Sequence, residues 1–407
     1  MKTYRIGTHR TVSPEQTLER IRPLFSAMGI TRLANVTGLD DIGIPVVTAC
    51  RPNAKAVAVS QGKGVSLAAA KASAAMEAIE TYHAENINLP VHFTSYNELA
   101  KNNEVVDIRT LPKMDVSSFS PDSRRVWIQG RQIQSKRAQF VPYDLVHCDF
   151  TLPLPQGSGC FQLSTNGLAS GNTIEEATCH ALCEVIERDA LALWSLLPKT
   201  HQAKKKVDTS TINDPTIRAL LEQVDQAGVM IGVWDVTSNI GTPTFFCMII
   251  NEHENQYRPL YAISGSGTHP DKHVAIMRAI TEAIQSRLTL ISGSRDDISL
   301  NKYESRQQLE KQRYIRDEIM SAPSYINFDT IDSWDNDTLE EDLVLLCAQL
   351  EQQALPNPIT VELTKPEFEI PVVRVIAPGL EGLHEVPGYV FGLRGQRVMQ
   401  EFKGQTP

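Results

Sequence analysis

Three stretches of the chain share one sequence pattern, and this internal repeat constrains the fold more than any other feature. Each begins with a residue that commonly caps a helix, namely Ser66, Thr173 or Asp271. An alanine follows four positions later, and a Glu-x-Ile-(Glu or Gln) element begins eleven positions later. Apolar residues return at helical spacing in all three stretches. The repeat therefore predicts three related long helices.

The second stretch places three carboxylates on one side of its helix. At about 100° per residue, Glu176, Glu184 and Glu187 form one stripe, whereas the apolar residues gather on the opposite side. Thr173 and Glu176 also have the spacing of a capping box, in which each side chain accepts a hydrogen bond from the other's backbone.

The other two helices carry polar stripes in the corresponding positions. Glu77 and Glu80 are i and i+3 neighbours in the first helix. Arg278, Glu282 and Gln285 stand at i, i+4 and i+7 in the third. We expect the three polar faces to converge on a common centre.

These stripes have two interpretations. A helix face rich in Glu is usually solvated surface. Like charges at this spacing repel each other, however, and their recurrence in two helices favours a bound cation. Carboxylate-only sites suit Mg²⁺, which usually also holds substrate phosphates. Arg188 and Arg278 are placed either to neutralise such phosphates or to form intrahelical salt bridges.

Strand-like runs lie between the helices and indicate an α+β or α/β body. We expect these strands at 46–48, 56–60, 126–129, 229–234, 244–250, 261–264 and 372–376. The charged stretch 301–353 carries Gln-rich helical pieces without a strand signal, and predicts a helical insertion or lid.

Composition excludes several classes of protein. The net charge of −9 would repel a phosphate backbone, so a nucleic-acid partner is not expected. The chain shows neither a secretory signal nor an apolar run long enough for a membrane span, which predicts a cytoplasmic protein without a membrane partner. Its seven cysteines include no C-x-x-C pair, and we interpret them as reduced thiols.

Two glycine-rich segments do not match known nucleotide loops. Residues 61–64, Gln-Gly-Lys-Gly, lack the spacing of a P-loop, and a tight turn between a strand and a helix is favoured there. Residues 265–267, Gly-Ser-Gly, lack the dinucleotide-binding fingerprint.

The chain resembles the YcaO family, from about Arg10 to Arg397. The resemblance rests on motifs within the three repeated stretches. They are Ser73-x-x-x-Glu77-x-x-Glu80, Asn172-x-x-x-Glu176, Glu184-x-x-Glu187-Arg188 and the segment from Arg278 to Arg287.

The resemblance implies an α+β fold with antiparallel sheets and carboxylate-bearing helices around a central nucleotide site. It implies Mg²⁺ ligation by Glu77, Glu80, Glu184 and Glu187, with Glu176 on either metal or nucleotide. The residues that it implies for nucleotide binding are Arg10, Thr17, Asn172, Arg188, Arg278 and Glu282.

Family members use ATP and Mg²⁺ to activate a backbone amide of a peptide or protein substrate. A nucleophile adds to the carbonyl carbon, and the oxygen leaves as phosphate; sulfide gives a thioamide, whereas a Cys, Ser or Thr side chain gives an azoline. The resemblance also implies a homodimer. We expect residues 1–60 to contribute to the nucleotide site, 61–397 to form the YcaO-like domain and 398–407 to be a tail.

Three features bear on the subtype. Thr81 stands where many members have Arg, and the last residues, 404–407, lack the proline-rich tail of many azoline-forming members. The segment 370–379 is similar to members that make peptide thioamides with a TfuA partner. Thioamide formation is therefore the main hypothesis, with an azoline-forming cyclodehydratase and a non-catalytic peptide-binding scaffold as the alternatives.

Overall fold

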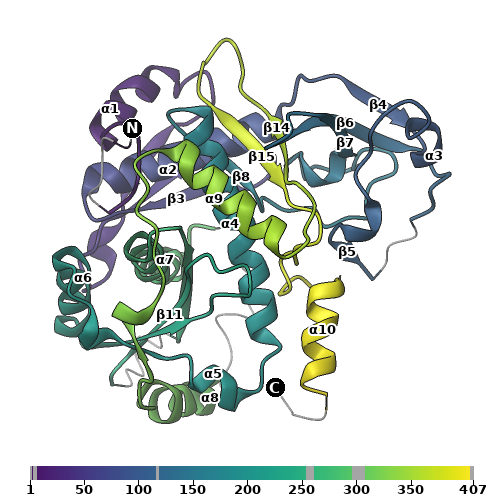
Figure 1. Cartoon of the computed structure of the whole chain (residues 1–407). Helices are drawn as coiled ribbons and strands as arrows, with labels where there is room; N and C mark the ends of the chain where they lie inside the picture. Colours follow the sequence, from purple (N-terminus) through teal and green to yellow (C-terminus); the bar gives the residue numbers. More distant parts are fainter. Residues whose placement is uncertain (1, 3–6, 116–118, 254–260, 296–307, 404–407) are drawn as a thin grey trace.

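The computed structural model of the chain describes residues 2, 7–115, 119–253, 261–295 and 308–403. In this part of the chain, antiparallel sheets alternate with long helices (Figure 1). The predicted fold class, α+β with antiparallel sheets, is confirmed.

Three antiparallel sheets form the framework. The first has the order β1-β2-β3, with strands Arg32–Asn35, Val46–Cys50 and Val59–Lys63. The second has the order β4-β6-β14-β15-β8, and β7 also pairs with β6. Its strands are β4 (Val91–Thr94), β6 (Arg125–Gln132), β7 (Ala138–Pro142), β8 (Leu168–Ser170), β14 (Ile359–Glu362) and β15 (Val372–Ile376). The third has the order β10-β11-β12, with strands Val229–Asp235, Thr244–Asn251 and Ile263–Thr268.

Each of these sheets ends in an edge strand that leads directly into a long helix. Strand β3 precedes α2 (Leu67–Glu85), β8 precedes α4 (Ile174–Ser195) and β12 precedes α7 (Lys272–Ser292). Three residues separate strand from helix in every case. The repeat in the sequence is therefore a strand–turn–helix unit that occurs once in each sheet.

Local chemistry explains the start of each helix. The side chains of Ser66, Thr173 and Asp271 accept hydrogen bonds from first-turn backbone amides at 3.1, 3.2 and 2.9 Å, so all three predicted caps are confirmed.

Two of the strands also pack very closely against the helices that follow them. A Cβ atom on Gly62 would lie 2.0 Å from the backbone of α2, and one on Gly265 would lie 2.2 Å from that of α7.

Two strand predictions were shifted, and five strands of these sheets were missed, namely β1, β4, β7, β8 and β14. The strand expected at 56–60 is Val59–Lys63, and the one expected at 261–264 is Ile263–Thr268. Strands β3 and β12 carry glycines and β8 has only three residues, so their positions depend on packing against a helix, which a local apolar pattern does not record.

The remaining elements complete the body. They are α1 (Pro14–Ile21), α3 (Tyr96–Leu99), α5 (Lys199–Ala203), α6 (Pro215–Gln226), α8 (Gln308–Tyr314), a π-helix (Ile315–Met320), α9 (Leu339–Gln352) and α10 (Leu393–Glu401). Two short sheets pair β5 (Lys113–Met114) with β16 (Tyr389–Val390) and β9 (Val207–Asp208) with β13 (Ile326–Asn327).

The stretch 301–353 is mainly helical where it is described. Helix α9 packs beside α4 through buried Leu346 and Leu350 (Figure 1). The expectation of no strand was wrong, because β13 adds a short parallel pair there. Residues 301–307 lie outside the described part, and the domain boundaries stay predictions. None of the described helices is long and apolar enough to cross a bilayer.

Candidate functional site

A cavity of about 780 Å³ opens between α2, α4, α7 and the N-terminal segment. This volume falls in the range typical of sites for small organic ligands. The predicted site residues from all these segments meet here. They are Arg10, Thr17, Glu77, Glu80, Asn172, Glu176, Glu184, Glu187, Arg188, Arg278 and Glu282.

Backbone and hydroxyl groups around β8 orient two of the carboxylates. One oxygen of Glu80 accepts hydrogen bonds from the Ser170 backbone N–H at 2.9 Å and hydroxyl at 2.7 Å. One oxygen of Glu184 accepts a bond from the Gly167 backbone N–H at 3.3 Å. These bonds engage one oxygen of each carboxylate and fix its direction.

Strand β12 likewise orients one carboxylate of α4 and one of α7. The hydroxyl of Ser266 lies 2.8 Å from Glu187 Oε1 and 3.2 Å from Glu282 Oε1, and its backbone N–H donates to Glu282 at 3.2 Å. The other oxygen of Glu282 accepts a bond from Lys63 Nζ at 2.5 Å. Ser266 therefore links two of the three repeated helices.

Burial makes several of these carboxylates hard to ionise. It raises the pKa of Glu80 to about 8, and the negative charges of Glu77 and Glu184 act in the same direction. It also raises the pKa of Glu77 to about 7, against the opposing effect of nearby cations. Burial is likewise the main cause of the raised pKa of Glu184. Such groups gain their full charge when a cation arrives.

The two predicted arginines differ in their partners. Arg188 Nη2 lies 3.9 Å from Glu184 and 3.6 Å from Glu187, so the intrahelical salt bridge forms. Arg278 instead places Nη1 3.2 Å from Nδ1 of His180. Burial and the positive charge of Arg278 both lower the pKa of His180. The buried Nε atoms of both arginines have no hydrogen-bond partner among the described residues. Each has a donor left for a ligand.

Glu176 organises the N-terminal side of the cavity. Its carboxylate accepts hydrogen bonds from Arg10 at 3.0 Å, from Thr11 at 2.9 and 2.8 Å and from the Asn172 side chain at 3.0 Å. Thr17 donates to Asn172 Oδ1 at 3.1 Å. Because these partners occupy Glu176, its side chain does not return to the helix cap, and the predicted capping box was wrong. This arrangement favours a role beside the nucleotide over metal ligation.

Sequence reasoning missed several residues that shape the cavity. Lys63 was assigned only to a turn, whereas it is the last residue of strand β3, and its side chain enters the carboxylate cluster. Ser170 and Ser266 carried no signal, because their roles depend on strand packing. Thr81 stands where many family members have Arg, and it accepts a hydrogen bond from Arg51 at 2.8 Å. Arg51 does not replace that arginine in the cavity, because it pairs with Glu85 and does not line the cavity.

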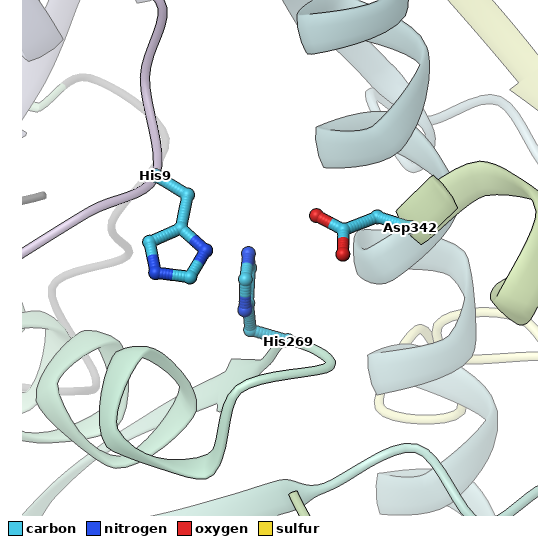
Figure 2. A group of neighbouring side chains, drawn as sticks. All are labelled: His9, His269 and Asp342. Carbon is cyan, nitrogen blue, oxygen red and sulfur yellow. The ribbon is translucent and has the colours of Figure 1, made fainter. Parts of the chain in front are cut away.

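A second buried group of charges lies beside the cavity, and Figure 2 shows His9, His269 and Asp342 pointing toward one another. We call Lys2, His9, His269, Asp271 and Asp342 the closed cluster. Lys2 Nζ lies 2.6 Å from Asp342, and His9 Nε2 lies 3.5 Å from Asp271. The Asp271 backbone N–H donates to His269 Nδ1, so the proton of neutral His269 sits on Nε2, the nitrogen that would face a metal. Lys2 thus supplies Asp342 with a cation from within the chain.

The residues of the cavity, in contrast, fit Mg²⁺ and a nucleotide. Carboxylates from two helices provide the oxygen ligands that Mg²⁺ prefers. The buried donors on Arg188 and Arg278 suit phosphate oxygens. The volume leaves room for the remainder of a nucleotide.

Comparison with known proteins agrees with this geometry. The family model described as a YcaO cyclodehydratase that binds ATP and Mg²⁺ matches residues 61–381. A Rhizobium leguminosarum protein from the region 3′ of tfuA is 35% identical over 405 residues, with 97% of this chain and 93% of that protein covered. A Methanothermobacter thermautotrophicus protein is 35% identical over 378 residues, with 91% and 95% covered.

Two solved structures share the fold. The Methanopyrus kandleri YcaO structure bound with AMPPCP and Mg²⁺ has a TM-score of 0.74 at 21% identity, covering 93% of this chain and 94% of that one. A heterocyclase in complex with substrate and cofactor has a TM-score of 0.75 at 22% identity. That match covers 92% of this chain, which spans about half (53%) of the heterocyclase.

Proposed function

The chain belongs to the YcaO family, whose ATP- and Mg²⁺-dependent enzymes modify peptides, and from this premise we propose that it converts a backbone amide of a ribosomally made peptide or protein into a thioamide. We propose that it does so in the cytoplasm, as a homodimer, with a TfuA-type partner. The observation that carries the proposal is the match, over nearly its whole length, to the protein from the tfuA 3′ region.

The proposed reaction balances without an oxidant or reductant. Hydrosulfide adds to the amide carbon, and the carbon–oxygen bond breaks as the oxygen leaves in inorganic phosphate. ATP becomes ADP, the sulfur stays in the peptide, and the proton of hydrosulfide ends on the phosphate. Bound Mg·ATP supplies the phosphoryl group that accepts the amide oxygen.

The chain's own residues would bind and orient the reactants. Glu77, Glu80, Glu184 and Glu187 would hold Mg²⁺, with the serines of β8 and β12 fixing the directions of Glu80 and Glu187. Arg188 and Arg278 would stabilise the negative charge on the phosphates. The task is positioning and charge neutralisation, and it requires no nucleophile from the protein.

An azoline-forming cyclodehydratase is the second candidate. It is supported by the description of the family model and by the shared fold with a heterocyclase. A non-catalytic scaffold is disfavoured, since the carboxylates and arginines of the cavity are all present.

Peptide mass spectrometry distinguishes the two chemistries. Peptides would be compared between host cells with and without the gene, and between cells carrying the wild type and Glu187→Gln. Exchange of oxygen for sulfur raises a peptide's mass, whereas loss of water in azoline formation lowers it. A gene-dependent mass increase supports the thioamide, a decrease supports the azoline, and no change in either direction contradicts both.

A further inference from the structure

Lys63, the last residue of β3, is a cation of the carboxylate cavity to which the sequence analysis gave no role in binding. Its Nζ pairs with Glu282 of α7, and the two side chains are only 19% and 24% exposed. Its charge also acts on Glu77 of α2 and on His180 of α4. Lys63 therefore reaches the point where all three repeated helices meet.

The backbone of Lys63 has little freedom to move. A Cβ on Gly62 would lie 2.0 Å from the backbone of Ala74, and one on Gly64 would lie 2.6 Å from the Cβ of Ala69. The two glycines let β3 and the following turn press against α2, so the Cα of Lys63 is held between them. Its flexible side chain can still change partners.

The charges that line the cavity indicate a role for the ammonium group of Lys63. Six Glu side chains line the cavity, and Glu282 keeps its charge because Lys63 and Arg188 oppose the effect of burial. An ammonium group beside Glu282 neutralises charge where a metal and phosphates would otherwise be needed. Lysine is also a common point-charge partner of phosphate.

We propose that Lys63 is an exchangeable counter-cation, which pairs with Glu282 in the empty cavity and moves its ammonium group to the phosphates when Mg·ATP binds. This inference rests on the cavity being the Mg·ATP site. The simpler alternative is a permanent salt bridge that only joins β3 to α7.

The two roles predict different responses to Lys63→Met. A counter-cation competes with metal in the empty cavity but assists the nucleotide. Its removal should therefore strengthen binding of Mg²⁺ alone several-fold and weaken binding of Mg·ATP about tenfold or more. Loss of a permanent salt bridge would loosen the site and weaken both.

Calorimetric titration of the whole chain with Mg²⁺ alone and with ATP in excess Mg²⁺ tests this difference. Lys101→Met is the control, because Lys101 forms an exposed salt bridge with Glu98 and does not line the cavity. Lys63→Arg should retain most Mg·ATP affinity, and Lys63→Gln replaces Lys63→Met if the latter does not fold. Changes of the same sign for both ligands, or no change, would overturn the proposal. Failure of the wild type to bind Mg·ATP would instead overturn the site itself.

Discussion

The carboxylate cavity and the closed cluster use similar residues to opposite effect. Both bury acidic groups beside basic ones within the same body. In the closed cluster, Asp342 has Lys2 at 2.6 Å and the His269 ring accepts a backbone bond. In the cavity, Glu77 and Glu80 have raised pKa values, as Asp342 has, but they line an open space of about 780 Å³. Access to an open cavity, rather than the mere gathering of ionisable groups, distinguishes a binding site from a structural contact.

The largest effect should follow from removing a carboxylate of the cavity. Glu184→Gln or Glu187→Gln should abolish measurable Mg·ATP binding, because the loss of a metal ligand should exceed the roughly 10- to 100-fold effect typical of outer-shell groups. Calorimetry measures the affinity, and circular dichroism checks the fold. Glu175→Gln, on the same helix but outside the cavity lining, is the matched control. Affinity like the wild type in both variants would remove the metal assignment.

Breaking the closed cluster should affect stability rather than binding. Lys2→Met leaves the buried Asp342 carboxylate without its cation and should lower the free energy of unfolding by about 3 kcal/mol. Denaturant titration measures this loss, and Asp342→Asn added to Lys2→Met should recover part of it. Mg·ATP affinity should stay close to that of the wild type. A variant that keeps its stability but loses nucleotide binding would reverse the distinction between the two regions.

How far the sequence predicts each region follows from the range of the interactions involved. Helix periodicity and caps such as Ser66 and Thr173 are local, so the three helices and their polar faces could be predicted. The convergence of those faces followed from the repeat and the family resemblance. Ser266 could not be predicted as a link between Glu187 and Glu282, because it depends on the packing of β12 against two helices. The closed cluster joins residues hundreds of positions apart and left no motif.

Mg²⁺ binding to the nucleotide-free protein should depend on pH. Burial raises the pKa of Glu77 to about 7 and of Glu80 to about 8, and a metal needs both as carboxylates. Affinity should therefore rise about tenfold or more between about pH 6 and pH 9 and then level off. Calorimetry in buffers of different ionisation enthalpy should show protons released on binding below pH 8. A constant affinity without proton release would contradict the raised pKa values.

The smallest expected effect concerns the stability of the metal-free protein. Between the ordinary carboxyl pKa and the raised values of about 7 and 8, the folded state holds more protons on Glu77 and Glu80 than the unfolded state does. Stability must then fall as the pH rises through this window. Excess Mg²⁺ should reverse the trend, since it binds the carboxylate forms of the folded state. Thermal unfolding with and without Mg²⁺ measures this, and Glu80→Gln should flatten the metal-free profile. The same profile for wild type and Glu80→Gln would locate the pH dependence outside the cavity.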